Sequence, residues 1–210
     1  MFSNNGDFMR EDFTASGHSQ YTIDGIDKNS PKWFKEASKK VHAAKDDDYV
    51  ELKSGLLTVD QINNLLEALP LEFSYVDDNN QFLAYNHADY QKRMTPRDKT
   101  QLGEGLANCF PSRSINGVKA LIHDLREGKH HVLQEPVPTE GYDFVVHFFQ
   151  RMNDKNGNYA GTVEWTHDIG PLIAYYLKIN GKKLVDADDA NTGASKTNSE
   201  TDASSGASAY

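Results

Sequence analysis

The sequence predicts an α+β fold in which a five-stranded antiparallel sheet carries helices on one face. Three observations support this prediction. Strand-like segments occur twice before and three times after one strongly helical segment. Short polar turns separate neighbouring strand segments, and such turns favour antiparallel pairing. Helices packed on one face of an antiparallel sheet bury the apolar sides of both layers.

The leading helix is predicted at 56–69. Thr58 or Asp60 can cap its first turn, and aliphatic side chains recur along it at helical spacing. Pro70 follows, and the residue before a proline is disfavoured in the helical conformation, so the helix should end there.

Two strands are predicted next, at 71–76 and 81–85. The two aspartates and two asparagines at 77–80 are typical of a turn, so the strands should form a hairpin. Apolar side chains alternate with Glu72 and Ser74 along the first strand. This alternation predicts that only one face of the strand is buried.

The central and closing segments complete the pattern. Residues 86–111 follow no period and are interrupted by proline and glycine. The clearest helix follows, with Ser114 as its expected cap and Gly128 as its end. Three strands and a closing helix are then predicted, at 130–138, 142–152, 159–167 and 169–179.

The composition divides the chain into three parts. Residues 1–50 are polar and expected to be partly disordered, with a short helix after Pro31, and the sequence leaves open whether they dock on the domain. The folded domain is expected at 51–180. The tail at 181–210 is poor in large apolar side chains, so it is expected to be disordered.

Charge and hydropathy argue against several partners. With 22 basic and 31 acidic residues the net charge is −9, which argues against nucleic acid or an anionic membrane as the main partner. No apolar run approaches the roughly 18 residues of a membrane span, and no signal peptide is evident. We therefore expect a cytoplasmic protein.

Three segments resemble the PAS domain found at the C-terminus of the bacterial DUF438 family. They are LEFSYVDDNN at 71–80, LGEGLANCFP at 102–111, and GYDFVVHFFQRMNDKNGNYAGTVEWTHD at 141–168. They occur in the family's order, and the resemblance covers 52–173. It implies a PAS fold and a bacterial signal-transduction module that binds a small ligand, forms a homodimer through its leading helix and sheet face, and acts through an unidentified partner protein.

The chain departs from the family pattern at two positions. The histidine that usually follows the cysteine is Phe110 here, and the arginine after the first glycine is Glu104. A haem or metal role cannot be carried over to Phe110, so haem is not favoured. A small apolar ligand is the expected occupant if the domain binds one.

Strand alternation nominates the lining of a ligand pocket between the sheet and the helices. For any one of these side chains an ordinary filled core is the simpler interpretation, because aromatic strand faces usually belong to the core. The nominated strand residues are Phe73, Tyr75, Phe144, Val146, Phe148, Val163 and Trp165, with Cys109, Phe110 and Leu121 above them.

The sequence gives no sign of catalytic or metal chemistry. A single cysteine, Cys109, allows neither an intrachain disulfide nor a thiolate cluster, and the eight histidines show no zinc-binding spacing. Glu164 and Asp168 lie about 13 Å apart if both are in one strand, too far to act as a pair. We expect no catalytic residue and no metal.

Two hypotheses of different classes remain. The first is a ligand-binding sensor that acts through a partner. The second is a ligand-free PAS fold that serves dimerisation or protein interaction. A haem sensor or an enzyme is the least favoured interpretation, since an enzyme needs a cluster of perturbed titratable groups.

Overall fold

The computed structural model describes residues 13, 15, 17, 19–87, 93–110, 112 and 114–186. The chain divides into two compact units, residues 1–168 and residues 169–210. The predictions for 1–12 and for the tail from 187 onward lie outside the described residues.

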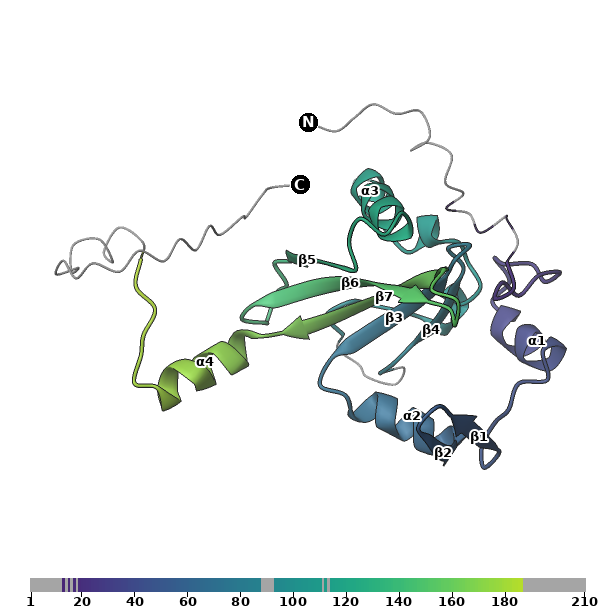
Figure 1. Ribbon diagram of the computed structural model, residues 1–210, viewed down its shortest axis with the longest axis horizontal. Coiled ribbons are helices and arrows are strands. Elements are labelled where there is room, and N and C mark those ends of the chain that lie inside the picture. The colour runs from purple at the N-terminus through teal and green to yellow at the C-terminus, as the bar shows by residue number, and fades with distance from the viewer. Residues whose placement is uncertain are drawn as a thin grey trace. The chain divides into compact units, whose positions relative to one another are not determined.

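The first unit contains a five-stranded antiparallel sheet with the spatial order β4-β3-β7-β6-β5 (Figure 1). Helix α3 lies over one face of this sheet and contacts β6 and β7. The predicted α+β fold is therefore confirmed. The strands are β3 (Glu72–Asp77), β4 (Phe82–Tyr85), β5 (Val132–Pro136), β6 (Val145–Asn153) and β7 (Tyr159–Asp168).

The predicted turn between the first two strands is present. One carboxylate oxygen of Asp77 accepts the backbone N–H groups of Asn79 and Gln81, at 2.9 and 2.8 Å. Asn80 adopts a positive φ of 61°, which asparagine tolerates better than most residues. The turn residues thus fix the geometry with which β4 returns along β3.

Helix α3 spans Ile115–Arg126 and buries Val118, Ile122 and Leu125. Ser114 occupies the N-cap position, but its side chain makes no capping hydrogen bond, so this part of the prediction was wrong. The described crossover residues 93–110 are irregular as expected and include the short 3₁₀ turns η2 (Lys99–Gln101) and η3 (Leu106–Asn108).

Helix α2 spans Val59–Ala68, shorter than the predicted 56–69, and of the two predicted caps it is Thr58 that caps it. The Thr58 side chain accepts from the Gln61 N–H while the Gln61 side chain accepts from the Thr58 N–H, which is a complete capping box. A small hairpin that the sequence did not predict precedes it, made of β1 (Tyr49–Leu52) and β2 (Gly55–Thr58).

The described part of the N-terminal segment packs on the domain and contains helix α1 (Trp33–Lys40). The second unit contains helix α4 (Gly170–Ile179), which matches the predicted closing helix and has a proline in its first turn. Among the residues that the structure describes, no helix combines the length and hydropathy needed to cross a bilayer.

Candidate functional site

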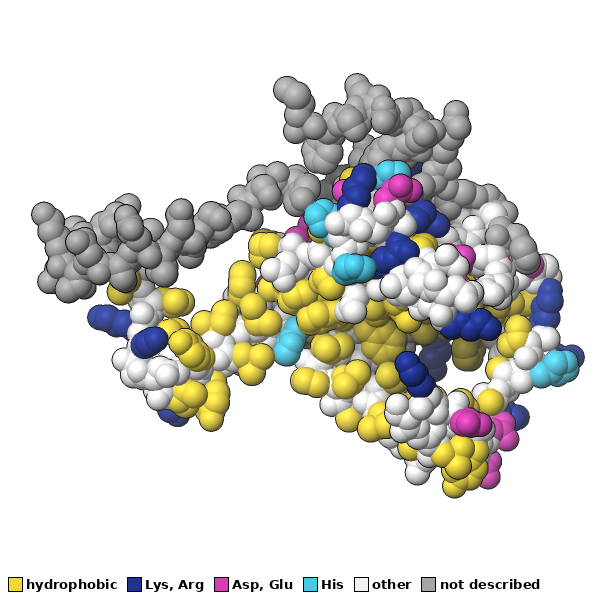
Figure 2. Space-filling view, in the orientation of Figure 1, with side chains coloured by type: hydrophobic (Ala, Val, Ile, Leu, Met, Phe, Trp, Pro, Cys, Tyr) yellow, Lys and Arg dark blue, Asp and Glu magenta, His cyan; other side chains and the backbone are white. Residues whose placement is uncertain are grey.

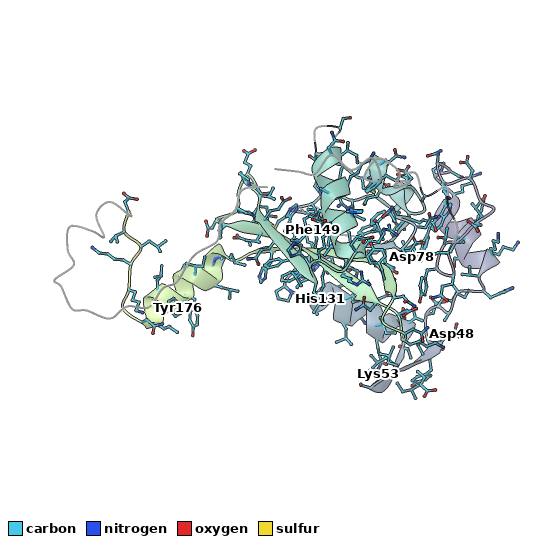
Figure 3. All side chains as sticks on the ribbon, turned by 45° about the horizontal axis from the view of Figure 1, so that its top comes forward. Asp48, Lys53, Asp78, His131, Phe149 and Tyr176 are labelled. Carbon is cyan, nitrogen blue, oxygen red and sulfur yellow. The ribbon has the colours of Figure 1, made fainter. Side chains whose placement is uncertain are left out.

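A small cavity lies between the sheet and the α3 layer, and two kinds of side chain line it. The apolar wall consists of Val76, Phe82, Leu106, Phe110, Val118, Ile122 and Phe149. The other lining residues are Ser74, Arg97, Cys109, Thr162 and Glu164. Figure 3 labels Phe149, which β6 contributes to this lining. An apolar chamber with a few convergent polar groups is the usual form of a small-molecule site.

The cavity is nearly filled by its own side chains. Its volume is about 20 Å³, room for about one water molecule by the usual requirement of roughly 10–15 Å³. A larger ligand would therefore have to displace lining side chains. Cys109 and Phe110 come directly after the 3₁₀ turn η3. Ser74, Val76, Thr162 and Glu164 belong to the central strands β3 and β7.

A buried ion pair dominates the polar wall. The Arg97 guanidinium donates to Glu164 Oε2 at 3.0 Å and to Ser74 Oγ at 3.1 Å. The side chains of Arg97 and Glu164 are only 8 and 9% exposed. Removing either charge alone would leave the other buried without a counter-charge, so the cavity depends on the pair as a unit.

His147 extends this polar group along the sheet. Its Nδ1 lies 3.2 Å from Glu164 Oε1, and its side chain is 13% exposed. Glu164 is thus placed between an arginine from the crossover and a histidine from β6. Each oxygen of the Glu164 carboxylate therefore has a side-chain nitrogen within 3.2 Å.

A second buried pair anchors the start of the crossover. Both Glu72 oxygens accept backbone N–H groups, from Met94 at 2.8 Å and from Thr95 at 2.9 Å. Arg93 Nη2 lies 3.6 Å from Glu72 Oε2, and both side chains are about 5% exposed or less. The crossover therefore supplies the cations that balance two strand carboxylates.

The structure corrects the predicted strand faces. Glu72, Ser74 and Glu164 belong to the buried set on β3 and β7, whereas the nominated residues Phe73 and Trp165 alternate with them. Phe73 pairs with Trp165 across the sheet, and Ser74 pairs with Glu164. The prediction assumed that the aromatic face is the inner one. It was wrong because the arginines of the crossover make a polar inner face possible.

The ten nominated residues therefore divide into three groups. Cys109 and Phe110 line the cavity, and Leu121 packs partly buried against the core. Phe144 is 44% exposed, just before β6, and Val146 is buried. Neither these three nor the remaining five line the cavity; the remaining five are Phe73, Tyr75, Phe148, Val163 and Trp165.

We call these last five residues the outer sheet face. The Phe148 and Trp165 rings stack with centroids 3.7 Å apart and planes 4° apart. Tyr75 donates its hydroxyl to the Ala160 carbonyl at 2.9 Å, and burial raises its pKa to about 12. All five side chains are partly exposed, and hydrophobic side chains gather over the sheet in Figure 2. The face is an apolar surface that water still reaches.

The cysteine in the cavity wall is not an activated nucleophile. Burial raises the pKa of the Cys109 thiol to about 11, so the thiol is protonated at neutral pH. No group of three or more His, Cys, Asp or Glu side chains is placed to hold a metal ion within the described part of the chain.

Comparison with known proteins agrees with this geometry. A family model described as "PAS domain" matches residues 62–170. A C-terminal domain from Streptococcus mutans, solved by crystallography, is 26% identical with a TM-score of 0.57, over 62% of this chain and 99% of that one. No curated protein matches the chain.

Two further solved structures are more distant. The PAS domain of Bordetella pertussis BvgS is 18% identical over 59% of this chain and 93% of its own, with a TM-score of 0.39. A sensory box sensor histidine kinase from Vibrio cholerae is 13% identical over 51% and 88%, with a TM-score of 0.38. These two similarities are too weak to support an argument about function.

Proposed function

Because the chain belongs to the PAS domain family, we propose that it is a sensor module that binds a small molecule in the core cavity and signals through a partner protein. The observation that carries this proposal is the buried Arg97–Glu164 pair in the wall of an otherwise apolar cavity. Burying charged side chains is costly, so they are not expected in the wall of a core cavity whose residues serve packing alone.

The lining indicates the chemistry of the ligand. Phe82, Val118 and Ile122 offer apolar surface, while Ser74 and Glu164 offer oxygen atoms and Arg97 offers N–H groups. The opposite charges of Arg97 and Glu164 favour a ligand without net charge. We therefore propose a small, largely apolar, neutral molecule with one polar group.

Sensing is favoured over catalysis for two reasons. The Cys109 thiol is protonated, and the carboxylate of Glu164 is engaged by Arg97, so neither is poised as a nucleophile or general base. Haem is not favoured because the position after the cysteine is Phe110. The DUF438 relationship, the cytoplasmic location and the absence of a nucleic-acid partner stay predictions.

Native mass spectrometry of freshly purified protein, with an absorbance spectrum of the same sample, tests the proposal. We expect an added mass that survives mild desalting. The Cys109→Phe variant, which fills the cavity, should lose it, and the matched variant Val163→Phe on the outer sheet face should keep it. An added mass retained in Cys109→Phe would place the ligand elsewhere. A Soret band would show that the protein binds haem and would overturn our expectation that it does not.

Dimerisation is a second candidate function. Leu65 and Leu69 on and just after α2 are 57 and 39% exposed, and α2 buries no residue. Leu65, Leu69 and the outer sheet face together offer exposed apolar surface of the kind that protein interfaces cover. We propose that a second copy of the chain covers both surfaces.

Light scattering during gel filtration tests dimerisation. Wild-type protein should show twice the monomer mass, and Leu65→Lys and Val163→Lys should each reduce it. Lys53→Gln, an exposed change on the β1–β2 turn, should leave the mass unchanged. A wild-type monomer, with no added mass in the ligand test, would contradict both proposed functions.

A further inference from the structure

The N-terminal segment is fastened to the wall of the cavity. We call the described residues from Phe13 to Lys40 the strap. Three of its side chains, Phe13, Trp33 and Ala37, are each 3% exposed and belong to the same core cluster as Phe82 and Leu106. The strap is therefore packed into the domain rather than laid along its surface.

Trp33 packs against Gly103 at a position where only glycine fits, and we call Gly103 the seat of Trp33. Gly103 has a φ of +92°, and a Cβ atom there would lie 2.1 Å from the indole ring. The Trp33 Nε1 donor is buried with no hydrogen-bond partner among the described residues. Because an unpaired buried donor loses its hydration, this seat holds the strap less firmly than its burial suggests.

Gln81 joins the strap to this seat. Its side chain is fully buried, its Oε1 accepts the Ile23 N–H at 2.9 Å, and its Nε2 donates to the Gly103 carbonyl at 3.1 Å. Nearby, Thr22 donates its hydroxyl to the Asp77 carboxylate at 2.8 Å. The strap, the start of β4 and the seat of Trp33 thus share one hydrogen-bond network.

The seat lies next to the cavity wall. Phe82 and Leu106 line the cavity and also belong to the cluster that holds the strap. The backbone N–H of Gly103 donates to the Phe82 carbonyl at 2.8 Å. A molecule that pushes Phe82 outward would therefore strain its hydrogen bond with Gly103, against which Trp33 packs.

We propose that the strap is a reversible cover, held in place while the cavity is contracted and released when the cavity is filled. Release would expose the apolar floor around Leu102, Gly103 and Leu106, with the Gln81 amide at its edge. The ligand-driven step rests on the proposed function, whereas the reversible docking of the strap does not. The strap then links events in the cavity to a surface that a partner protein can reach.

Strap docking can be measured directly, because Trp33 and Trp165 are the only tryptophans in the chain. In a Trp165→Phe background, Gly103→Ala should shift the Trp33 emission to the red. The amides of Ile23 and Ala107, whose acceptors are Gln81 Oε1 and the Phe13 carbonyl, should exchange at least tenfold faster. Gly117→Ala, with no atom within 4 Å of the added Cβ, is the matched control.

Amides of β6 and β7 distinguish release from unfolding and should stay protected in Gly103→Ala. Trp33→Ala, which leaves the positive-φ backbone intact, provides a second variant read by exchange alone. The proposal of reversible docking would be overturned if the Ile23 amide exchanged at the wild-type rate in both variants. It would also be overturned if the β6 and β7 amides lost their protection together with the Ile23 amide in both variants.

Filling the cavity tests the coupling. Cys109→Phe should release the Ile23 amide as Gly103→Ala does, whereas Cys109→Ala should not. An Ile23 amide that stays protected in a folded Cys109→Phe variant would overturn the coupling, whatever the native mass spectrum shows. A missing ligand in the mass spectrum, with release in Cys109→Phe, would instead count against the proposed function alone.

Discussion

Arg97 Nη2 lies 3.0 Å from Glu164 Oε2, and both side chains are more than nine-tenths buried. Arg97 comes from the irregular crossover and Glu164 from the middle of β7, so the pair joins segments 67 positions apart in the sequence. This pair explains why the inner face of β3 and β7 can be polar. A strand carboxylate under a helix is stable here because the crossover delivers a guanidinium to it.

Breaking the pair on one side should destabilise the domain strongly. Arg97→Met or Glu164→Leu alone should lower the free energy of unfolding by about 3–5 kcal/mol, because each leaves an uncompensated buried charge. The double variant should be close to wild type. Urea denaturation of all four proteins measures the coupling. Asp124→Asn, which breaks the exposed Asp124–Lys129 pair, should have little effect. Additive losses in the double variant would contradict the paired role.

Gly161 should tolerate no side chain. Its φ is +134°, and a Cβ atom would lie 2.2 Å from the Val76 carbonyl oxygen on the adjacent strand. We expect Gly161→Ala to cost roughly 2–5 kcal/mol through backbone strain and overpacking between β3 and β7. Gly157→Ala, also at positive φ but with no atom within 4 Å of the added Cβ, isolates the strain. Equal thermal shifts for the two variants would show that the close approach is unimportant.

Stability should fall in alkaline solution because of Cys109. Burial raises the pKa of its thiol from 9.0 to about 11, so the unfolded chain ionises first. The thiol therefore contributes no pH dependence below about pH 9, and stability is lost as the pH rises from 9 to 11, by at most ~2–3 kcal/mol. The urea midpoint at pH 8 and pH 10.5 measures this loss.

Cys109→Ala is the control for that titration. It should flatten the fall in stability between pH 9 and 11, although Tyr75, whose pKa is also raised, keeps part of it. A fall as steep as that of wild type would mean that Cys109 does not contribute. In the native protein at pH 8, a thiol reagent should modify Cys109 far more slowly than in urea.

The α2 capping box should act locally. Thr58→Ala removes the acceptor for the Gln61 N–H and should destabilise the helix by about 1 kcal/mol, whereas Thr58→Ser should keep the bond. Because α2 buries no residue, the loss should appear as faster amide exchange in its first turn. A large fall in the global unfolding midpoint would instead show that α2 is needed for the folding of the sheet.

The sequence alone determined the five strands of the main sheet, the helices around them and the order of these elements, but not the β1–β2 hairpin. Turn residues at 77–80, the capping residue Thr58, Pro70 and the helical stripe of α3 each act over a few neighbouring positions, so local patterns were enough to predict them. The α+β class followed because only a few arrangements bury the apolar sides of such elements.

Tertiary structure decided which face of the sheet is inside and what the N-terminal segment does. Alternation shows that a strand has two faces, and the aromatic one is the reasonable choice for the core until long-range charge pairing is known. Arg97 reaches Glu164, and Trp33 reaches Gly103, across 67 and 70 positions. Such contacts depend on the path of the whole chain, and no local pattern in the residues encodes them.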